Sequence, residues 1–157
     1  MKRIIEFLFG KKSNRASAQP DTQFRRLNID WNADPVDPDV SIKTDQADLR
    51  IEFTLNHNVY TRFTNGQRAT LEFQNCSRYR IGKTNDEGWY RGQCRFSGIA
   101  PNWGEFYSIT GDSKFDQISE DWIHVENGSG SNHFLFYMKD DTFECLADGY
   151  RFREIAS

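Results

Sequence analysis

The stretch HFLFYMKDDTFECLADGYRF, residues 133–152, places a run of apolar residues before a charged turn and an alternating run after it. Residues 133–138 are apolar on both faces, which is typical of a strand in the centre of a buried sheet. Residues 139–142 have the composition of a turn, and beyond them Cys145 faces the predicted core while Glu144 faces away. The stretch therefore predicts a buried structural hairpin, not a pair of strands that presents these two side chains to a substrate.

Alternation of apolar and polar residues continues through much of the chain. It predicts further strands at residues 49–55, 69–82, 89–96, 103–109, 122–126 and 150–155. The segment 69–82 is either one long strand or two strands joined at a bulge near Asn75. The 13 Phe, 6 Tyr and 4 Trp suit half-buried pleated surfaces. We therefore predict a mainly β fold, a single antiparallel β-barrel or β-sandwich of about nine to ten short strands.

The ends of the predicted domain follow from composition. Residues 1–30 are predicted to hold a short amphipathic helix over residues 1–9 and then a polar linker, and residues 31–157 form the single β domain. The apolar start is shorter than the roughly 7–15 residues of a secretory signal and the roughly 20 of a membrane span, so no membrane contact is expected. The polar run 127–132, NGSGSN, is predicted to be a flexible turn.

Charge and cysteine content narrow the function classes. Residues 1–30 carry seven Lys/Arg against three Asp/Glu, whereas residues 31–157 carry thirteen against twenty. An acidic body argues against general nucleic-acid binding. The three cysteines are far apart and no zinc-type spacing is present, so we expect reduced thiols in a cytoplasm, with no metal and no cofactor.

Residues 75–147 resemble a group of small uncharacterised bacterial proteins. The motifs that carry the resemblance are an Asn-Cys-x-x-Tyr-Arg-x-Gly strand, a (Pro/Thr)-Asn-Asp-Glu loop and a Thr-Phe-Glu-Cys-Leu-Ala strand near the C-terminus. Thr84 stands where the pattern has proline, and Gly88-Trp89 replaces a less aromatic stretch. The resemblance implies a bacterial cytosolic setting and brings no catalytic residues.

One face of the predicted strands around the loop at residues 83–88 is a candidate binding site. If the alternation holds, this face carries Arg78, Arg80, Trp89, Arg91 and Arg95. Like charges opposite one another across strands are mildly destabilising, so an anionic partner would relieve them. Arginine binds carboxylates in a forked geometry, and an exposed tryptophan can anchor a protein partner. The face therefore favours recognition of another protein.

Two other interpretations of these segments stay open. Surface acids such as Glu72 would pair with the arginines and leave a solvated face without function. Alternatively, an aromatic pocket would take a small ligand or serve an enzyme. Its candidate lining is Trp89, Tyr90, Trp103, Glu105 and Tyr107.

Catalysis has no motif to support it. The three histidines are isolated, Cys145 is predicted to be an inert core thiol, and Cys76, on the outward side, is the one thiol with a chance of reactivity. The sequence therefore predicts no catalytic residue and favours a non-enzymatic cytosolic binding module of the immunity or regulatory kind. RNA binding through the arginine face is a third option, which the acidic body makes the weakest.

Overall fold

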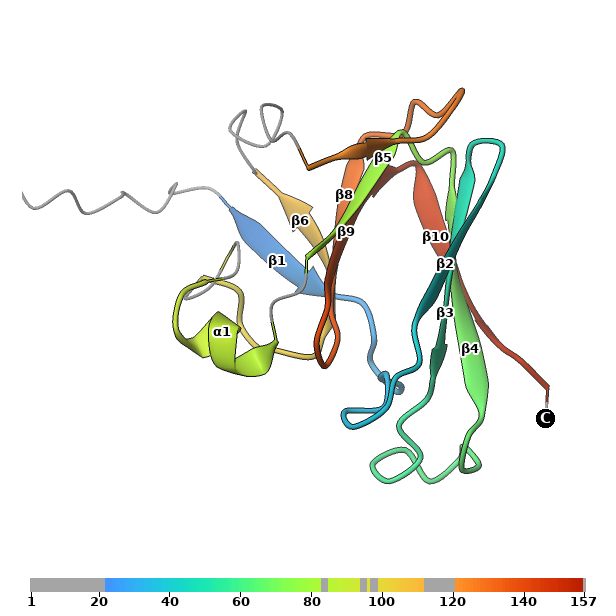
Figure 1. The fold of residues 1–157 in the computed structure, drawn as a ribbon, viewed down its shortest axis with the longest axis vertical. Helices are drawn as coiled ribbons and strands as arrows, with labels where there is room; N and C mark the ends of the chain where they lie inside the picture. Colours follow the sequence, from blue (N-terminus) through green and yellow to red (C-terminus); the bar gives the residue numbers. More distant parts are fainter. Residues whose placement is uncertain (1–21, 83–84, 94–95, 97–98, 112–120, 157) are drawn as a thin grey trace, which may run out of the picture.

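The computed structural model describes residues 22–82, 85–93, 96, 99–111 and 121–156. In this part of the chain ten strands and one short helix form two antiparallel sheets (Figure 1). The predicted mainly β, antiparallel fold is thus confirmed. The two sheets pack face to face, so the described strands form the sandwich alternative and not a closed barrel. The helix predicted over residues 1–9 lies outside the described residues.

The six-stranded sheet has the order β1-β6-β8-β9-β5-β7. Its strands are β1 (Gln23–Arg26), β5 (Arg78–Gly82), β6 (Phe106–Thr110), β7 (Ile123–His124), β8 (Asn132–Tyr137) and β9 (Thr142–Ala147). The four-stranded sheet has the order β10-β4-β3-β2. Its strands are β2 (Ser41–Asp45), β3 (Asp48–Thr54), β4 (Arg68–Gln74) and β10 (Gly149–Glu154). The helix α1 (Asp86–Tyr90) lies in the connection between β5 and β6.

Aromatic side chains from both sheets meet in the core between them. The rings of Phe53 and Phe136 lie 5.4 Å apart, and those of Phe73 and Phe134 lie 5.5 Å apart. Trp31, which precedes β2, is buried and stacks on Phe152 of β10 at 4.4 Å. Aromatic contacts at these separations add to the free energy gained from the buried area. The core therefore depends on rings contributed by both sheets.

The hairpin predicted at residues 133–147 is present. Strands β8 and β9 pair antiparallel with Phe136 opposite Phe143. Cys145 is fully buried in the core between the sheets, and Glu144 is also buried, on the other face of the sheet. The segment is structural, as its apolar composition predicts.

The chain passes twice between the sheets at one corner. Strand β4 leads into β5 through residues 75–77, and β9 leads into β10 through Asp148. Asn75 has a φ of 51°, and its side-chain amide donates to Asp148 at 2.8 Å. The segment 69–82 is therefore two strands, but they lie in different sheets, and the interruption at Asn75 is a crossing point and not a bulge within one strand.

Three expectations need correction. Strand β1 pairs with β6 inside the region predicted to be a linker, so the sheet begins before residue 31.

Residues 86–90 form α1 where a strand over 89–96 was predicted, because the Asn85 side chain caps a helical turn by accepting from the N–H of Gly88. The turn 127–132 is held by Asn75, whose side-chain and backbone oxygens accept the N–H groups of Ser129 and Gly130.

The two sheets differ in what covers their outer faces. A second apolar cluster packs on the outer face of the six-stranded sheet. It contains Trp89, Ala100, Tyr107, Ile109, Leu135 and Tyr137. The outer face of the four-stranded sheet instead carries exposed or half-buried polar side chains. Among the described residues, this second face is the uncovered one.

Candidate functional site

Arg78 and Arg80, two of the predicted binding residues, lie on the outer face of β5, opposite the core-packed Tyr79. Their guanidinium groups lie over the ring of Trp122, 4.8 Å and 4.5 Å from its centroid. Cation–π contacts of this kind are favourable, especially when the cation is desolvated. The indole that accompanies these arginines is therefore Trp122, whereas the sequence pointed to Trp89.

Arg80 belongs to a buried charged cluster. Its Nε and Nη2 donate to Oε1 of Glu144 at 3.1 Å and 2.8 Å, and Nη1 lies 3.2 Å from Asp121. The second oxygen of Glu144 lies 2.7 Å from Nε2 of His133. Arg80 is 8% exposed and Glu144 is 2% exposed. Because these charges already match one another inside the protein, Arg80 is poorly suited to binding an external anion.

Trp89 and Arg91 lie in different surroundings, at and just after the end of α1. Trp89 packs against Tyr137 and Trp103 over the six-stranded sheet, and its buried Nε1 has no hydrogen-bond partner among the described residues. Arg91 pairs with Glu87 one helical turn earlier. Arg95 lies outside the described residues. The structure thus brings Arg78 and Arg80 together around Trp122 and gives Trp89 and Arg91 separate contacts.

The residues of the predicted aromatic pocket likewise have separate surroundings and do not form one site. Tyr107 is buried, and its hydroxyl donates to the carbonyl oxygen of Asn102. Glu105 accepts from Asn28 at 2.7 Å. Tyr90 is 75% exposed, and of the five predicted residues Trp103 lines a pocket of substantial volume.

That pocket, here called the Trp103 pocket, has a volume of about 490 Å³. Trp103 stacks on Tyr137 with the ring centroids 4.8 Å apart. The remaining lining is mainly polar. It includes three asparagines, Asn32, Asn56 and Asn85, with Asp34, Lys139 and Asp140. A small-molecule site typically combines an apolar surface with a few convergent polar groups, which describes this lining.

The two described cysteines are both in the core. Cys76 is fully buried, which contradicts the outward position predicted from its place in the alternation. The crossing point at Asn75 shifts the alternation, so that residue 76 turns inward. A hydrogen bond from Cys145 lowers the pKa of Cys76, and burial raises the pKa of Cys145 well above its ordinary value. Neither thiol is accessible to a substrate.

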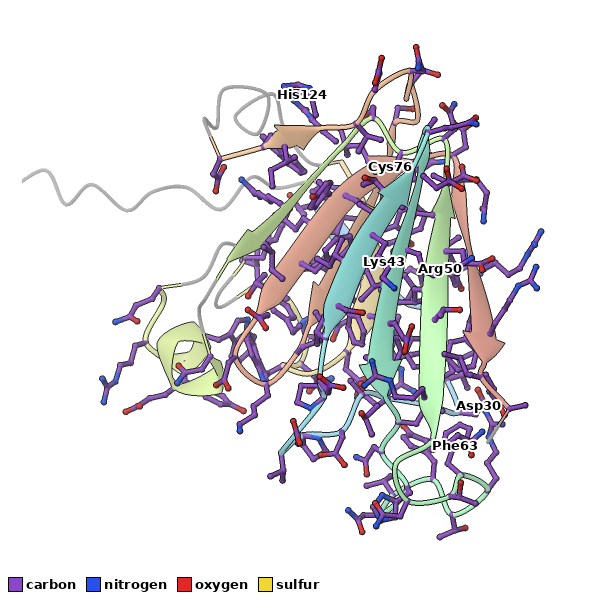
Figure 2. The ribbon with its side chains drawn as sticks, turned by 45° about the vertical axis from the view of Figure 1, so that its right-hand side comes forward. Asp30, Lys43, Arg50, Phe63, Cys76 and His124 are labelled. Carbon is purple, nitrogen blue, oxygen red and sulfur yellow. The ribbon has the colours of Figure 1, made fainter. Side chains whose placement is uncertain are left out.

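A group of basic side chains lies on the uncovered face of the four-stranded sheet. Lys43 on β2 is directly opposite Arg50 on β3, and Figure 2 shows the two at neighbouring positions. Arg50 is opposite Glu72 on β4, which is opposite Arg151 on β10. Arg153 follows on β10. We call the four basic residues, Lys43, Arg50, Arg151 and Arg153, the cationic row.

The four positive charges of the cationic row exceed the charge of Glu72, the carboxylate that forms ion pairs with them. Glu72 pairs with Arg50 at 3.0 Å and with Arg153 at 3.3 Å. Lys43 and Arg151 form no ion pair with any residue that the structure describes. A groove of about 470 Å³ runs between them, lined also by Asp45 and Asp48 at one end. This site was not predicted from the sequence, because its residues come together only through the pairing of β2, β3, β4 and β10.

Two further observations concern metal binding and membrane crossing. The described residues contain no group of three or more His, Cys, Asp or Glu side chains that could hold a metal ion. In the same part of the chain, no helix has the length and hydropathy that crossing a membrane requires.

Comparison with protein-family models, with curated proteins and with solved structures found no match to this chain. The resemblance to small bacterial proteins therefore stays a prediction. The cationic row and the Trp103 pocket are the two candidate sites of the described residues.

Proposed function

We propose that this protein is a non-enzymatic binding module, of the immunity or regulatory kind, that recognises an acidic surface of a partner protein through the cationic row. The observation that carries the proposal is the Lys43–Arg50 pair, two like charges directly opposite each other on an exposed sheet face. Such a pair is destabilising in the free protein. A carboxylate of a partner would relieve that repulsion.

The surroundings of the cationic row favour an external partner over an internal one. The outer face of the other sheet is covered by the chain's own apolar cluster, whereas this face is uncovered among the described residues. Residues 1–21 carry five Lys/Arg and two Asp/Glu, so their charge does not complement the row. An acidic segment of another protein does, because arginine binds carboxylates in a forked geometry and lysine attracts them as a point charge.

The same face is less suited to nucleic acid. Binding of single-stranded RNA combines basic side chains with aromatic rings on which bases stack. The outward positions of β3 and β4 carry no aromatic residue, since Asp48, Arg50, Glu52, Arg68, Thr70 and Glu72 occupy them. A protein carboxylate is therefore the better match.

The test uses a peptide of about fifteen residues rich in Glu and Asp, with a Gln/Asn version as its neutral counterpart and an oligouridine as the RNA arm. The acidic peptide should shift the backbone amide NMR signals of Lys43, Arg50, Glu72 and Arg151, and added salt should weaken the effect. The double variant Lys43→Glu/Arg151→Glu should abolish binding without a change of fold.

The matched control is Arg25→Glu/Arg91→Glu, which changes the net charge by the same amount at exposed sites elsewhere. It should bind the acidic peptide as the unmodified protein does. Loss of binding in the control alone, or shifts confined to β5 and α1, would transfer recognition to the six-stranded sheet and its connections. Absence of binding to the acidic peptide, or tighter binding of the oligouridine, would refute the proposal.

A second candidate function is the binding of a small ligand in the Trp103 pocket. It is favoured by the observation that Trp103, a predicted pocket residue, lines a cavity of about 490 Å³ beside Tyr137. A ligand present at about 100 times its Kd should stabilise the fold by about 2.7 kcal/mol. A thermal-shift screen of a broad metabolite panel tests this, and it should lose its hits in Trp103→Ala.

A further inference from the structure

The polar lining of the Trp103 pocket has a common pattern at its three asparagines. The side-chain oxygen of Asn32 accepts the N–H of Ala33 at 2.8 Å, that of Asn56 accepts the N–H of Val59 at 3.2 Å, and that of Asn85 accepts the N–H of Gly88 at 3.0 Å. These bonds fix the orientation of each carboxamide. The NH₂ groups of all three asparagines form no hydrogen bond with a described residue, so the pocket has three uncommitted donors.

Two acidic residues in the lining of the Trp103 pocket, Asp34 and Asp140, add hydrogen-bond acceptors and affect which ligand charge the pocket accepts. One oxygen of Asp34 accepts the N–H groups of Val36 and Asp37, which leaves its other oxygen uncommitted. Asp140 is 3.8 Å from the ammonium group of Lys139, so these two charges largely cancel. An anionic ligand would face the carboxylate of Asp34, which forms no ion pair with a described residue. The lining therefore disfavours an anionic ligand and suits one whose groups both donate and accept hydrogen bonds.

The aromatic wall adds a flat apolar surface. Trp103 is half-buried, and its ring is held by Tyr137 at 4.8 Å and Trp89 at 6.3 Å. A ring supported on one side presents its other face at little cost in side-chain entropy. Sugar rings have hydroxyl groups along their edge and C–H groups on their faces, so they match edge donors and acceptors together with an aromatic plane.

From these three features we infer that the Trp103 pocket binds a neutral saccharide. The inference rests on the second candidate function and names its ligand class. Hydroxyl oxygens of the sugar accept from the NH₂ groups of Asn32, Asn56 and Asn85, a sugar hydroxyl donates to Asp34, and a C–H face lies against Trp103. The volume of about 490 Å³ falls within the range of known small-molecule sites, about 300–1,000 Å³.

The experiment first compares three sugars that share one ring and differ in charge through a single substituent. Glucose, glucuronic acid and glucosamine supply one ring in neutral, anionic and cationic forms, and cellobiose, maltose, lactose and diacetylchitobiose extend the neutral set. Binding is followed by protein-detected NMR up to about 10 mM, which is sufficient for a Kd near 1 mM. At least one neutral sugar should bind and shift the Trp103 indole signal, and neither charged ring should bind more tightly than glucose.

The diagnostic variant is Asn32→Asp/Asn85→Asp. Each aspartate keeps the oxygen that accepts the backbone N–H and loses the NH₂ donor, so the local fold and the cap of α1 are retained. The affinity for the neutral sugar should fall about tenfold or more. The matched control Asn58→Asp/Asn127→Asp adds the same charge at exposed asparagines outside the pocket and should bind as the unmodified protein does.

Three outcomes would overturn the saccharide inference. They are no binding by any neutral sugar, tighter binding of a charged ring than of glucose, or unchanged affinity in Asn32→Asp/Asn85→Asp. A non-sugar metabolite whose stabilising effect disappears in Trp103→Ala would refute the ligand class while supporting small-ligand binding itself. The two failures can thus be told apart.

Discussion

Glu144 connects three strands and a loop through two oxygen atoms. One oxygen accepts from Arg80 on β5 and the other lies beside His133 on β8, while Arg80 also reaches Asp121. All of this occurs on the outer face of the six-stranded sheet. Removal of one member of a buried ionic group leaves the others without compensation, which costs more than the group itself contributes.

We therefore predict that Glu144→Gln lowers the free energy of unfolding by about 3 kcal/mol or more. Urea denaturation at neutral pH measures this. Glu72→Gln is the control, because Glu72 pairs with Arg50 and Arg153 at the surface, and it should cost less than about 1 kcal/mol. Equal losses in the two variants would show that the buried cluster is not integral to the fold.

The buried thiol of Cys145 makes stability sensitive to alkaline pH. Burial raises its pKa in the folded protein, so above pH about 8.5 the unfolded chain loses this proton while the folded protein keeps it. The free energy of unfolding should therefore fall as the pH rises above about 8.5, by at most about 1.4 kcal/mol per pH unit. Cys76, whose pKa is lowered, acts in the opposite direction and offsets part of the loss.

Denaturation under reducing conditions at pH values between about 7 and 9.5 tests this dependence. The variant Cys145→Ala should be less stable at neutral pH and should show a flatter decline. A decline as steep in Cys145→Ala as in the unmodified protein would assign the effect to other groups.

Single residues also show where reasoning from the sequence fails. The inward position of Cys145 and the outward position of Arg78 and Arg80 follow from alternation within one strand, and the structure has both. Cys76 was placed on the wrong side, because the positive φ of Asn75 breaks the alternation between β4 and β5. Alternation counted along the sequence cannot show that the backbone changes direction between two strands.

The turn that contains Gly130 packs tightly against the crossing point. A Cβ atom at Gly130 would lie 2.4 Å from the backbone oxygen of Asn75 and 2.4 Å from the backbone carbon of Ala147. These backbone atoms cannot move aside without disturbing β9. We predict that Gly130→Ala destabilises the protein by about 2 kcal/mol or more, measured by thermal or urea denaturation.

Gly82→Ala is the matched control, since its Cβ would meet Thr142 at 3.9 Å, an ordinary contact. It should change the free energy of unfolding by less than about 1 kcal/mol. If Gly130→Ala were equally mild, the turn would have to be more adaptable than its packing indicates.

Whole strands were predictable where their residues alternate or are uniformly apolar, as in β3, β8 and β9. The start of the strand predicted over residues 89–96 was wrong, because alternation over a few residues does not distinguish a strand from a helical turn. Here the cap at Asn85 decides the outcome. Strand β1 was missed because four mostly polar residues become a strand only through pairing with β6.

Trp31 shows how the molecule as a whole is held together. It lies outside the named strands, yet it contacts Phe53 and Phe152 of one sheet and Phe106 and Phe136 of the other. We predict that Trp31→Ala costs about 3–5 kcal/mol, with a common decrease in stability for both sheets because the lost ring belongs to both.

Hydrogen exchange on slowly exchanging amides of β3 and β8 would test this. Both sets should lose protection by the same free energy in Trp31→Ala, and Trp31→Phe should lose less. Loss confined to one sheet would mean that the sheets unfold separately.

The general architecture could be predicted from the sequence, but the candidate sites could not. Aromatic content and alternation indicate an antiparallel β fold around an apolar interior, and they do not decide between a barrel and a sandwich. The order of the strands depends on long-range pairing, which no local pattern encodes, and the cationic row is a product of that order. The predicted arginine face assumed that neighbours along the chain are neighbours in space, whereas Arg80 finds its carboxylate 64 residues away.

The two passages of the chain at Asn75 and Asp148 lie side by side and are joined by a hydrogen bond of 2.8 Å. One passage is three residues long and the other is a single residue. The third passage between the sheets, residues 27–40 from β1 to β2, is longer, so the corner at Asn75 and Asp148 is the shortest attachment between the two sheets. We expect this corner to remain closed until the whole structure is lost, because a short attachment leaves the two sheets little freedom to separate there.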